Sequence, residues 1–265
     1  MQKPHHDVTA IIMAGGKGSR AGALGRVLPK CLFPIAGKQT MLVRLVEQLQ
    51  AAGIGRAVIC CSAESFPAIS AFVEEHAAIG VFPDLSIQPV ECSSTTLGPL
   101  PALAEAIGSK PAPWHLLCLG DIFFTRSPFT DFLSDSVHHA GVDGCLLTGK
   151  DLRAADDAGT GAVACEGPNV HEISYRPFPK EPTAPRHCRR WTGSFFFRGE
   201  LALDLQTHAA TYHGAPFENW VAGLLARGAR CIWNDVGPFI NVNSAEDYEY
   251  LVSGISAPAE VSETA

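Results

Sequence analysis

The sequence predicts an α/β fold, in which a mostly parallel sheet flanked by helices is followed by a small antiparallel extension. In the first half of the chain, apolar strand-like runs alternate with segments of helical periodicity, which implies parallel strands joined by right-handed crossovers. After about residue 140 the strand-like runs follow one another through loops, which predicts the extension. We expect a single domain over residues 1–253, divided at about residue 140, and a disordered tail at 254–265, where small residues precede an acidic end.

The first half begins with an apolar strand, Val8–Met13, and a helix, Met41–Ala52, whose apolar residues fall on one face. A later hydrophobic strand, Trp114–Leu119, ends in Gly120-Asp121. The other segments predicted in this half are strands at Arg56–Cys61 and Leu85–Gln88, and helices at Phe66–Ala77, Leu100–Ile107 and Ser127–His139.

The second half consists mainly of predicted strands. One helix begins near Phe217 and ends at Arg227. Ser244 and Asp247 have the spacing of a capping box, so a second helix is expected to begin there. The strands are expected at Gly144–Thr148, Gly161–Cys165, Val170–Ser174, Trp191–Phe197, Cys231–Val236 and Phe239–Asn243.

The composition is that of an ordinary soluble globule, with 46% hydrophobic and 18% charged residues. Its net charge of −7 argues against binding to nucleic acid or to an anionic membrane surface. The nine cysteines are scattered and include no C-x-x-C pair, which favours a reducing cytosol without disulfides. No apolar run approaches the roughly 20 residues of a membrane helix, and the first is too short for a signal peptide. We therefore expect a cytoplasmic protein, and a homo-oligomer is compatible with the sequence.

A glycine-rich, basic loop at residues 14–38 follows the first predicted strand. Glycines let backbone N–H groups approach an anion, and successive amides act as a fixed partial positive charge. Between Val8 and Val46 there is no Asp or Glu. A strand, a glycine turn and a helix with this excess of positive charge predict a site for a polyphosphate. The cations in this region are Lys17, Arg20, Arg26, Lys30, Lys38 and Arg44.

Two common phosphate-binding motifs fit this loop poorly. Gly37-Lys38 does not end a P-loop, because the first glycine and the final Ser or Thr of that motif are missing. Residues 16–21 have the spacing of a dinucleotide fingerprint, but that motif expects a helix to begin at its third small residue. Here the loop continues through Leu28-Pro29-Lys30, so the dinucleotide interpretation is disfavoured.

Two motifs in the loop, Gly-Gly-x-Gly-Ser-Arg and Leu-Pro-Lys-x-Leu-x-Pro-Ile-x-Gly-Lys, resemble the signature of nucleotidyltransferases that join an NTP to a sugar 1-phosphate. The resemblance implies a Rossmann-like sheet of the GT-A type, with a nucleotide-binding half at about 8–140 and an acceptor-binding half at about 141–253. It also implies that Arg20 holds the β and γ phosphates and that Lys30 neutralises the α-phosphate under attack. The loop residues that would surround the nucleotide are Ala14, Gly15, Gly16, Gly18 and Ser19.

The resemblance further implies a nucleobase site framed by a Gln and then a Leu-Gly turn. Gln88 and Leu97-Gly98 match these features, but the segment Pro89–Thr96 between them is longer than in the family. We expect Gln88 and Gly98 to contact the nucleotide. The alternative for Gln88 is that it only caps an edge strand.

A carboxylate and two amides are candidate ligands for Mg²⁺, a cation that prefers oxygen ligands and bridges phosphates. Ligands of open α/β sheets gather beyond the carboxyl ends of strands, where Asp121 is expected, although a surface turn would also place an Asp there. By the resemblance, Asp121 binds the metal and Asn241-Val242-Asn243, similar to an Asp-Val-Asn motif, supplies a second ligand. Strand alternation would put Asn241 and Asn243 on the same side. We expect Asn243 to be the ligand, with Asn241 as the alternative.

Three residues of the second half are candidates for binding the acceptor. Arg176 lies where the family often has Glu-Lys-Pro, and its guanidinium would pair with the acceptor phosphate. Gly193 begins a segment that resembles the strand beside the acceptor, where it would allow close backbone approach. Glu218 corresponds to a Glu that often binds sugar hydroxyls, but it would equally favour a helix N-terminus.

The resemblance therefore implies transfer of NMP from an NTP to a sugar 1-phosphate, with release of pyrophosphate and with Mg²⁺ as the cofactor. Arg20, Lys30 and Asp121 would be the catalytic residues, and their joint presence argues against a nucleotide-sensing domain without turnover. The same loop would also serve a different phosphorylated acceptor (alditol, cyclitol or choline phosphate, or molybdopterin), and its glycines alone would fit a dinucleotide oxidoreductase. In the favoured interpretation the partners are small molecules, not nucleic acid or membrane.

Overall fold

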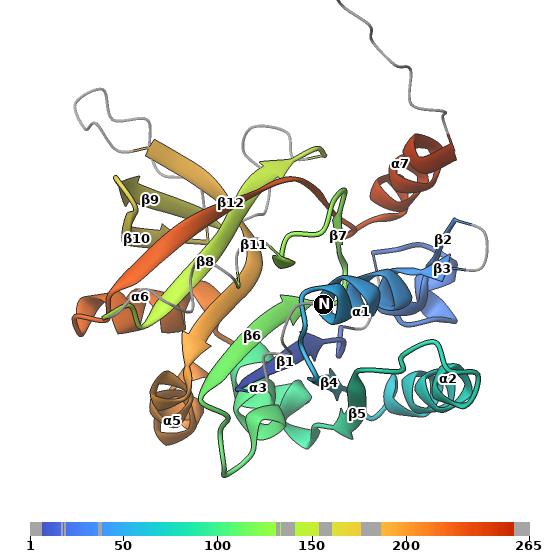
Figure 1. Cartoon of the computed structure of the whole chain (residues 1–265), viewed down its shortest axis with the longest axis horizontal. Helices are drawn as coiled ribbons and strands as arrows, with labels where there is room; N and C mark the ends of the chain where they lie inside the picture. The colour runs from blue at the N-terminus through green and yellow to red at the C-terminus, as the bar shows by residue number, and fades with distance from the viewer. Residues whose placement is uncertain are drawn as a thin grey trace, which may run out of the picture.

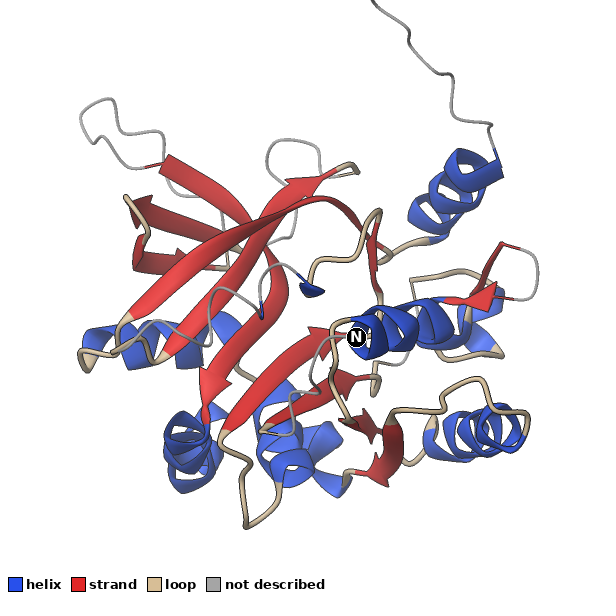
Figure 2. Ribbon diagram, in the orientation of Figure 1, coloured by secondary structure: helices blue, strands red, loops and turns tan. Residues whose placement is uncertain are grey.

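The computed structural model describes residues 7–16, 18, 20–36, 39–130, 133, 141–153, 161–175 and 187–256. Most of the helix expected at Ser127–His139 and residues 257–265 of the expected tail lie outside this set. Within it, ten strands form one continuous sheet, and helices cover both of its faces (Figure 2).

The strands of the first half are parallel, as the sequence predicts. From one edge inward they are β5 (Ser86–Glu91), β4 (Arg56–Cys61), β1 (Val8–Met13) and β6 (Trp114–Leu119). The chain passes outward from β1 to β5 and then returns to the other side of β1 with β6 (Figure 1). The carboxyl end of β1 is therefore a topological switch point, where open α/β sheets bind ligands. The crossover helices are α1 (Met41–Ala51), α2 (Phe66–Ala78) and α3 (Pro99–Ile107).

The antiparallel extension continues the same sheet. β11 (His187–Arg198) pairs antiparallel with β6 on one side and with β8 (Gly144–Asp151) on the other. β9 (Ala162–Glu166) and β10 (Asn169–Ser174) form an antiparallel pair at the far edge, and β9 also pairs with β11. Because β11 is bonded directly to β6, the two halves of the chain share one sheet.

The last strand, β12 (Cys231–Asn241), also joins the two halves. It runs parallel to β8 and then pairs antiparallel with β7 (Ile122–Phe124), a short strand that the sequence did not predict. The two strands predicted for this region are one strand, whose register shifts between Asp235 and Pro238. Since β7 begins immediately after Asp121, this pairing brings the end of β12 beside the end of β6.

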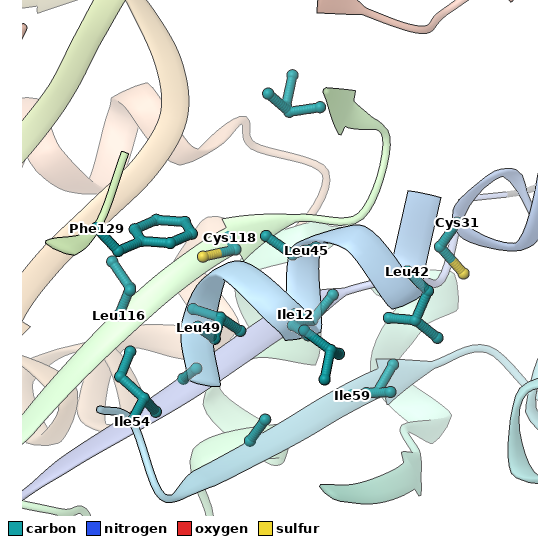
Figure 3. Packing of buried hydrophobic residues seen from close by; sticks show 14 of the residues in the cluster. Ile12, Cys31, Leu42, Leu45, Leu49, Ile54, Ile59, Leu116, Cys118 and Phe129 are labelled. Atoms are coloured by element: carbon teal, nitrogen blue, oxygen red, sulfur yellow. The ribbon is translucent and has the colours of Figure 1, made fainter. Parts of the chain in front are cut away.

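Two hydrophobic clusters pack on opposite faces of the sheet, because alternate residues of a strand point to opposite sides. Ile12 belongs to one cluster and Ile11 to the other. On the first face, α1 places Leu42, Leu45 and Leu49 over the sheet, as its predicted apolar stripe requires (Figure 3). On the second face lie α3, α5 (Gly199–His208) and α6 (Phe217–Ala226).

Three further features complete the fold. A hairpin of β2 (Pro34–Ala36) and β3 (Gln39–Thr40) precedes α1, and neither it nor α5 was predicted. α7 (Ala245–Ser256) follows β12 and extends three residues into the segment expected to be a tail. Eight of the nine cysteines are buried and pack as small apolar residues, and Cys118 lies in the cluster shown in Figure 3. Among the described residues, no helix has the length and apolar character needed to cross a membrane.

Candidate active site

Three chain segments meet at the switch point. The glycine loop follows β1, Asp121 follows β6, and Asn243 follows β12. The backbone ties them together, because the Val242 N–H donates to the Asp121 carbonyl at 2.9 Å and the Gly120 N–H donates to the Met13 carbonyl at 3.0 Å. Residues far apart in the sequence are therefore held in one place by main-chain hydrogen bonds.

Four predicted residues form a polar cluster there. The Lys30 ammonium donates to Asp121 Oδ2 at 3.1 Å and approaches Asn243 Oδ1 at 3.5 Å. An Arg20 Nη donates to the same Asn243 oxygen at 3.4 Å. The Lys30 and Asp121 side chains are 12% and 28% exposed, so both are largely shielded yet reachable from solvent. Two cations and two oxygen ligands thus converge, as expected for a polyphosphate site.

The glycine loop is shaped by close backbone contacts. Gly18 has φ +62°, a conformation that residues with a Cβ rarely adopt, and its carbonyl accepts the Ala21 N–H at 2.8 Å. A Cβ added to Gly25 would lie 2.2 Å from that same carbonyl oxygen, so the loop folds back on itself only with glycine there. A short 3₁₀ turn then begins at Lys30 and is anchored by the buried Phe33.

Asn243 is positioned by the predicted capping box at the start of α7, which the structure confirms. The Asp247 carboxylate accepts the Asn243 N–H at 3.0 Å and the Ser244 N–H at 2.9 Å, and the Asp247 N–H donates to Ser244 Oγ at 3.2 Å. Arg153 pairs with Asp247 at 3.4 Å. β12 ends at Asn241, so strand alternation does not extend to Asn243, and the expectation that both amides share one side of a strand does not apply.

A cavity of about 290 Å³ opens beside this cluster. Of the predicted nucleotide-binding residues, Gly15, Gly16 and Gly98 line it together with Asp121. The residues that complete its wall are Met13, Thr95, Pro99, Ala102 and Leu119, none of which the sequence analysis selected. Leu119 could have been found as the last strand residue before Gly120-Asp121, whereas no sequence signal marks Thr95.

Three described residues that were predicted to bind the nucleotide, Ala14, Gly18 and Gln88, do not line this cavity. The Ala14 N–H already donates to the Cys60 carbonyl at 2.9 Å, so it is not free for a phosphate. Gln88 is exposed in the middle of the edge strand β5, opposite Val58, and not at an end of the strand, where a cap would lie. Ser19 lies outside the described residues.

A second cavity of about 230 Å³ lies on the other side of Leu119 and Pro99. Gly193, Glu218 and Asn241 all line it, although they come from different strands and a helix. Gly193 has φ +77°, and a Cβ there would lie 2.3 Å from Leu119 Cδ1, so this position requires glycine. Arg176, the predicted phosphate clamp, lies outside the described residues. Further lining residues are Gly161, Tyr175, Trp191, Thr192, Pro216 and Phe217.

Glu218 contributes a buried carboxyl group to this second cavity. It lies in the first turn of α6, is 8% exposed and packs against Gly161. Burial raises the pKa of the Glu218 carboxyl, because the charged form loses hydration. A carboxyl held in this way can exchange hydrogen bonds with a hydroxyl group of a bound molecule.

The arrangement of these groups is typical of one class of protein. Cations and a carboxylate lie at the switch point of an α/β sheet, beside a glycine-lined cavity that shares Leu119 and Pro99 with a second cavity containing hydrogen-bonding groups. Such an arrangement suits an enzyme that binds a nucleoside phosphate beside a second small molecule.

The chain belongs to the family of MobA-like NTP transferase domains, whose model matches residues 10–236. It is therefore a nucleotidyltransferase. The match begins in β1 and ends in β12, so it includes both halves of the sheet.

The chain is similar in sequence to part of one further protein and in fold to several solved structures. A bifunctional IPC transferase and DIPP synthase of Aquifex aeolicus (strain VF5) is 38% identical over 68 residues, which are 26% of this chain and only 16% of that protein. The inositol-1-phosphate CTP transferase of T. maritima has a TM-score of 0.74 at 16% identity, covering 96% of this chain and 98% of that one. A putative glucose-1-phosphate thymidylyltransferase of Bacillus anthracis has a TM-score of 0.71 at 18% identity, covering 93% and 94%. The predicted fold is thereby confirmed.

NTP transferases of this family generally use a divalent metal, and the residues present fit one. Asp121 Oδ2 and Asn243 Oδ1 converge on one point, since both lie within 3.5 Å of the Lys30 ammonium. Two oxygen ligands suit Mg²⁺, which usually takes one or two protein ligands and completes its shell with substrate phosphates and water. The described residues contain no group of three or more His, Cys, Asp or Glu side chains that could hold a metal ion without such help. Asn241, in contrast, faces the second cavity.

Proposed function

We propose that this protein transfers NMP from an NTP to a sugar 1-phosphate and releases pyrophosphate. The observation that carries the proposal is the cluster of Arg20, Lys30, Asp121 and Asn243 beside the glycine-lined cavity. The NTP lies in the glycine-lined cavity and the acceptor in the cavity with Glu218, and their phosphates meet at the cluster.

The reaction is an in-line attack of an acceptor phosphate oxygen on the α-phosphorus. Such a transfer depends mainly on positioning and on neutralising charge. Arg20 binds the β and γ phosphates, which leave as pyrophosphate, and Lys30 stabilises the charge on the α-phosphate oxygens. Asp121 and Asn243 would hold Mg²⁺, which supplies further charge neutralisation when bound. No nucleophilic side chain is needed.

The acceptor is oriented by the second cavity. Glu218 and the Asn241 amide bind acceptor hydroxyls, and Gly193 lets the acceptor approach the backbone. Arg176 is proposed, on the sequence alone, to pair with the acceptor phosphate. Leu119, which lines both cavities, separates the acceptor body from the nucleotide.

A second candidate acceptor is a cyclitol phosphate. It is favoured by the similarity to proteins described as an IPC transferase and as an inositol-1-phosphate CTP transferase. The site chemistry is the same for both acceptors, because a cyclitol also presents a ring of hydroxyl groups.

The test is pyrophosphate release with Mg²⁺, for four NTPs against sugar 1-phosphates and inositol 1-phosphate. We expect release that requires one NTP and one acceptor, is lost in Asp121→Ala and is retained in Asp84→Ala, a matched change at an exposed loop. Release with inositol 1-phosphate alone selects the second candidate. If no acceptor of either class supports release although an NTP binds, the proposal is wrong.

A further inference from the structure

The segment between Gln88 and Gly98, the two residues expected at the nucleobase, contributes to the wall of the proposed nucleotide cavity. Residues Ser93–Leu97 form a 3₁₀ turn, η3, between β5 and α3. Thr95 of this turn and the following Gly98 line the nucleotide cavity. A Cβ added to Gly15 would lie 3.1 Å from Thr95 Cγ2, so η3 packs directly against the glycine loop. With the phosphates at Asp121, the nucleoside lies against η3.

One side chain from another element holds the start of this turn. Glu105, in α3, accepts the Ser93 N–H at 3.1 Å and the Ser94 N–H at 2.9 Å. Its carboxylate also accepts both hydroxyls, from Ser93 Oγ at 3.3 Å and from Ser94 Oγ. Burial opposes ionisation of Glu105, but the hydrogen bonds from Ser94 and Ser93 outweigh it, so its pKa is lowered. The carboxylate is thus ionised at neutral pH, and it accepts hydrogen bonds from four donor groups.

Backbone groups outside the turn also hydrogen-bond Thr95 and Leu97. The Thr95 N–H and Oγ1 both donate to the Cys92 carbonyl, at 3.2 and 2.9 Å. The Leu97 carbonyl accepts the Gly214 N–H at 2.7 Å. Apart from the flanking residues Cys92 and Gly98, the described residues that hydrogen-bond the turn are Glu105 and Gly214, and only Glu105 does so through its side chain.

We infer that Glu105 is a positioning residue that sets nucleobase selectivity by fixing η3 against the base. The inference rests on the proposed function, because it takes an NTP as the ligand and the glycine-lined cavity as its site. A rigid cavity wall discriminates between bases, because it forms contacts with one base that it does not form with another. A mobile wall would adapt to each base and would discriminate less. The residue that sets selectivity therefore lies behind the wall and does not touch the base.

Glu105→Gln tests this inference. Glutamine has one oxygen and one NH₂ where the carboxylate has two oxygens, so one serine would face a donor instead of an acceptor. We expect KM for the preferred NTP to rise about tenfold with kcat nearly unchanged, and KM for the poorest NTP to change less than about twofold. Selectivity would then fall about tenfold. Glu91→Gln is the matched control, since Glu91 is exposed at the end of β5 and its side chain forms no hydrogen bond within the described chain.

A double-mutant cycle separates positioning from general destabilisation. Ser93→Ala with Ser94→Ala removes two of the four donors and should lower selectivity in the same direction, but less. When it is combined with Glu105→Gln, the double serine change should lower selectivity little further, because the carboxylate that both serine hydroxyls contact is already absent. Equilibrium NTP binding, measured without acceptor, gives the same selectivity ratio independently of turnover.

The outcomes distinguish this inference from the proposed function. If wild-type protein binds no NTP, the proposed function fails. If wild-type protein discriminates between NTPs and Glu105→Gln keeps the same ratio, the inference is overturned and the function stands. Equal losses for all NTPs together with a lowered Tm would also overturn it, because they indicate a purely structural role.

Discussion

The two cavities that meet at Leu119 are built in opposite ways. The nucleotide side has charged groups at its edge, with Arg20, Lys30 and Asp121 close together and partly exposed. The acceptor side places one buried carboxyl, Glu218, in a wall formed largely by apolar and aromatic residues. Recognition of a polyphosphate needs charged side chains that are accessible from solvent. Recognition of hydroxyl groups needs a few polar side chains within a largely apolar cavity wall. Changes on the two sides should therefore affect different kinetic constants.

The largest effect is expected from removing charge on the nucleotide side. Lys30→Ala should lower kcat/KM by roughly 10²- to 10³-fold, because the ammonium stabilises charge at the α-phosphate. Its effect on Tm should be small, since the Asp121 carboxylate that loses its partner is 28% exposed and can be hydrated by solvent. Steady-state kinetics and thermal melts check both parts.

The control for this change is Lys110→Ala, at an exposed lysine that is not part of the cluster. It should leave kcat/KM unaltered. Lys30→Ala protein that kept its activity within tenfold of wild type would contradict the role of Lys30, and it would remove the contrast between the two cavities.

A smaller effect is expected on the acceptor side. Glu218→Gln should raise KM for the acceptor about tenfold and leave KM for the NTP unchanged, because a hydrogen bond to a charged group is lost. Glu200→Gln is a matched control, since Glu200 also lies in the first turn of a helix but is exposed. An equal rise in both KM values would show that the cavities are not separate.

The same variant gives a pH prediction. A carboxyl whose pKa is higher in the folded than in the unfolded protein binds more protons when folded, so stability falls as pH rises above its ordinary value of 4.5. Glu218→Gln removes this dependence. The free energy of unfolding of the variant relative to wild type should therefore increase between pH 4.5 and pH 7. Denaturant melts at both values measure it, and a difference that is constant or decreases with pH would contradict the raised pKa.

The nucleotide side was largely predictable because its chemistry lies in one continuous loop and at the ends of predicted strands. Lys30 and Asp121 were found in this way, and so was the capping box that holds Asn243. Main-chain pairing was harder to predict. β7 has only three residues, too few for a periodic signal, yet its pairing with β12 brings Asn243 to Asp121.

Gln88 shows where sequence reasoning stops. Its residue type and order matched a base contact, but the long segment after it folds into η3, which occupies the wall of the cavity. The bonds that hold η3 come from Glu105, eleven and twelve residues later, and no local pattern predicts them. The acceptor wall is similarly assembled from residues of several strands and α6, so only Gly193 and Glu218 were identifiable as separate candidates.

The smallest expected effect concerns the boundary between the two sides. Asn243→Asp should lower the Mg²⁺ concentration for half-maximal activity roughly fivefold, because a carboxylate binds the cation more tightly than an amide oxygen. Asn241→Asp should leave that concentration unchanged and raise KM for the acceptor, since Asn241 lines the second cavity. Magnesium titrations of pyrophosphate release measure both variants.

These two substitutions are chemically identical and lie two residues apart, so each serves as the control for the other. Their separation depends on β12 ending at Asn241, after which the Asp247 carboxylate holds the Asn243 and Ser244 N–H groups and turns Asn243 toward Lys30. If Asn241→Asp shifted the Mg²⁺ dependence and Asn243→Asp did not, Asn241 would be the metal ligand. The charged cluster would then extend into the acceptor cavity, and the division of charge between the two sides would no longer hold.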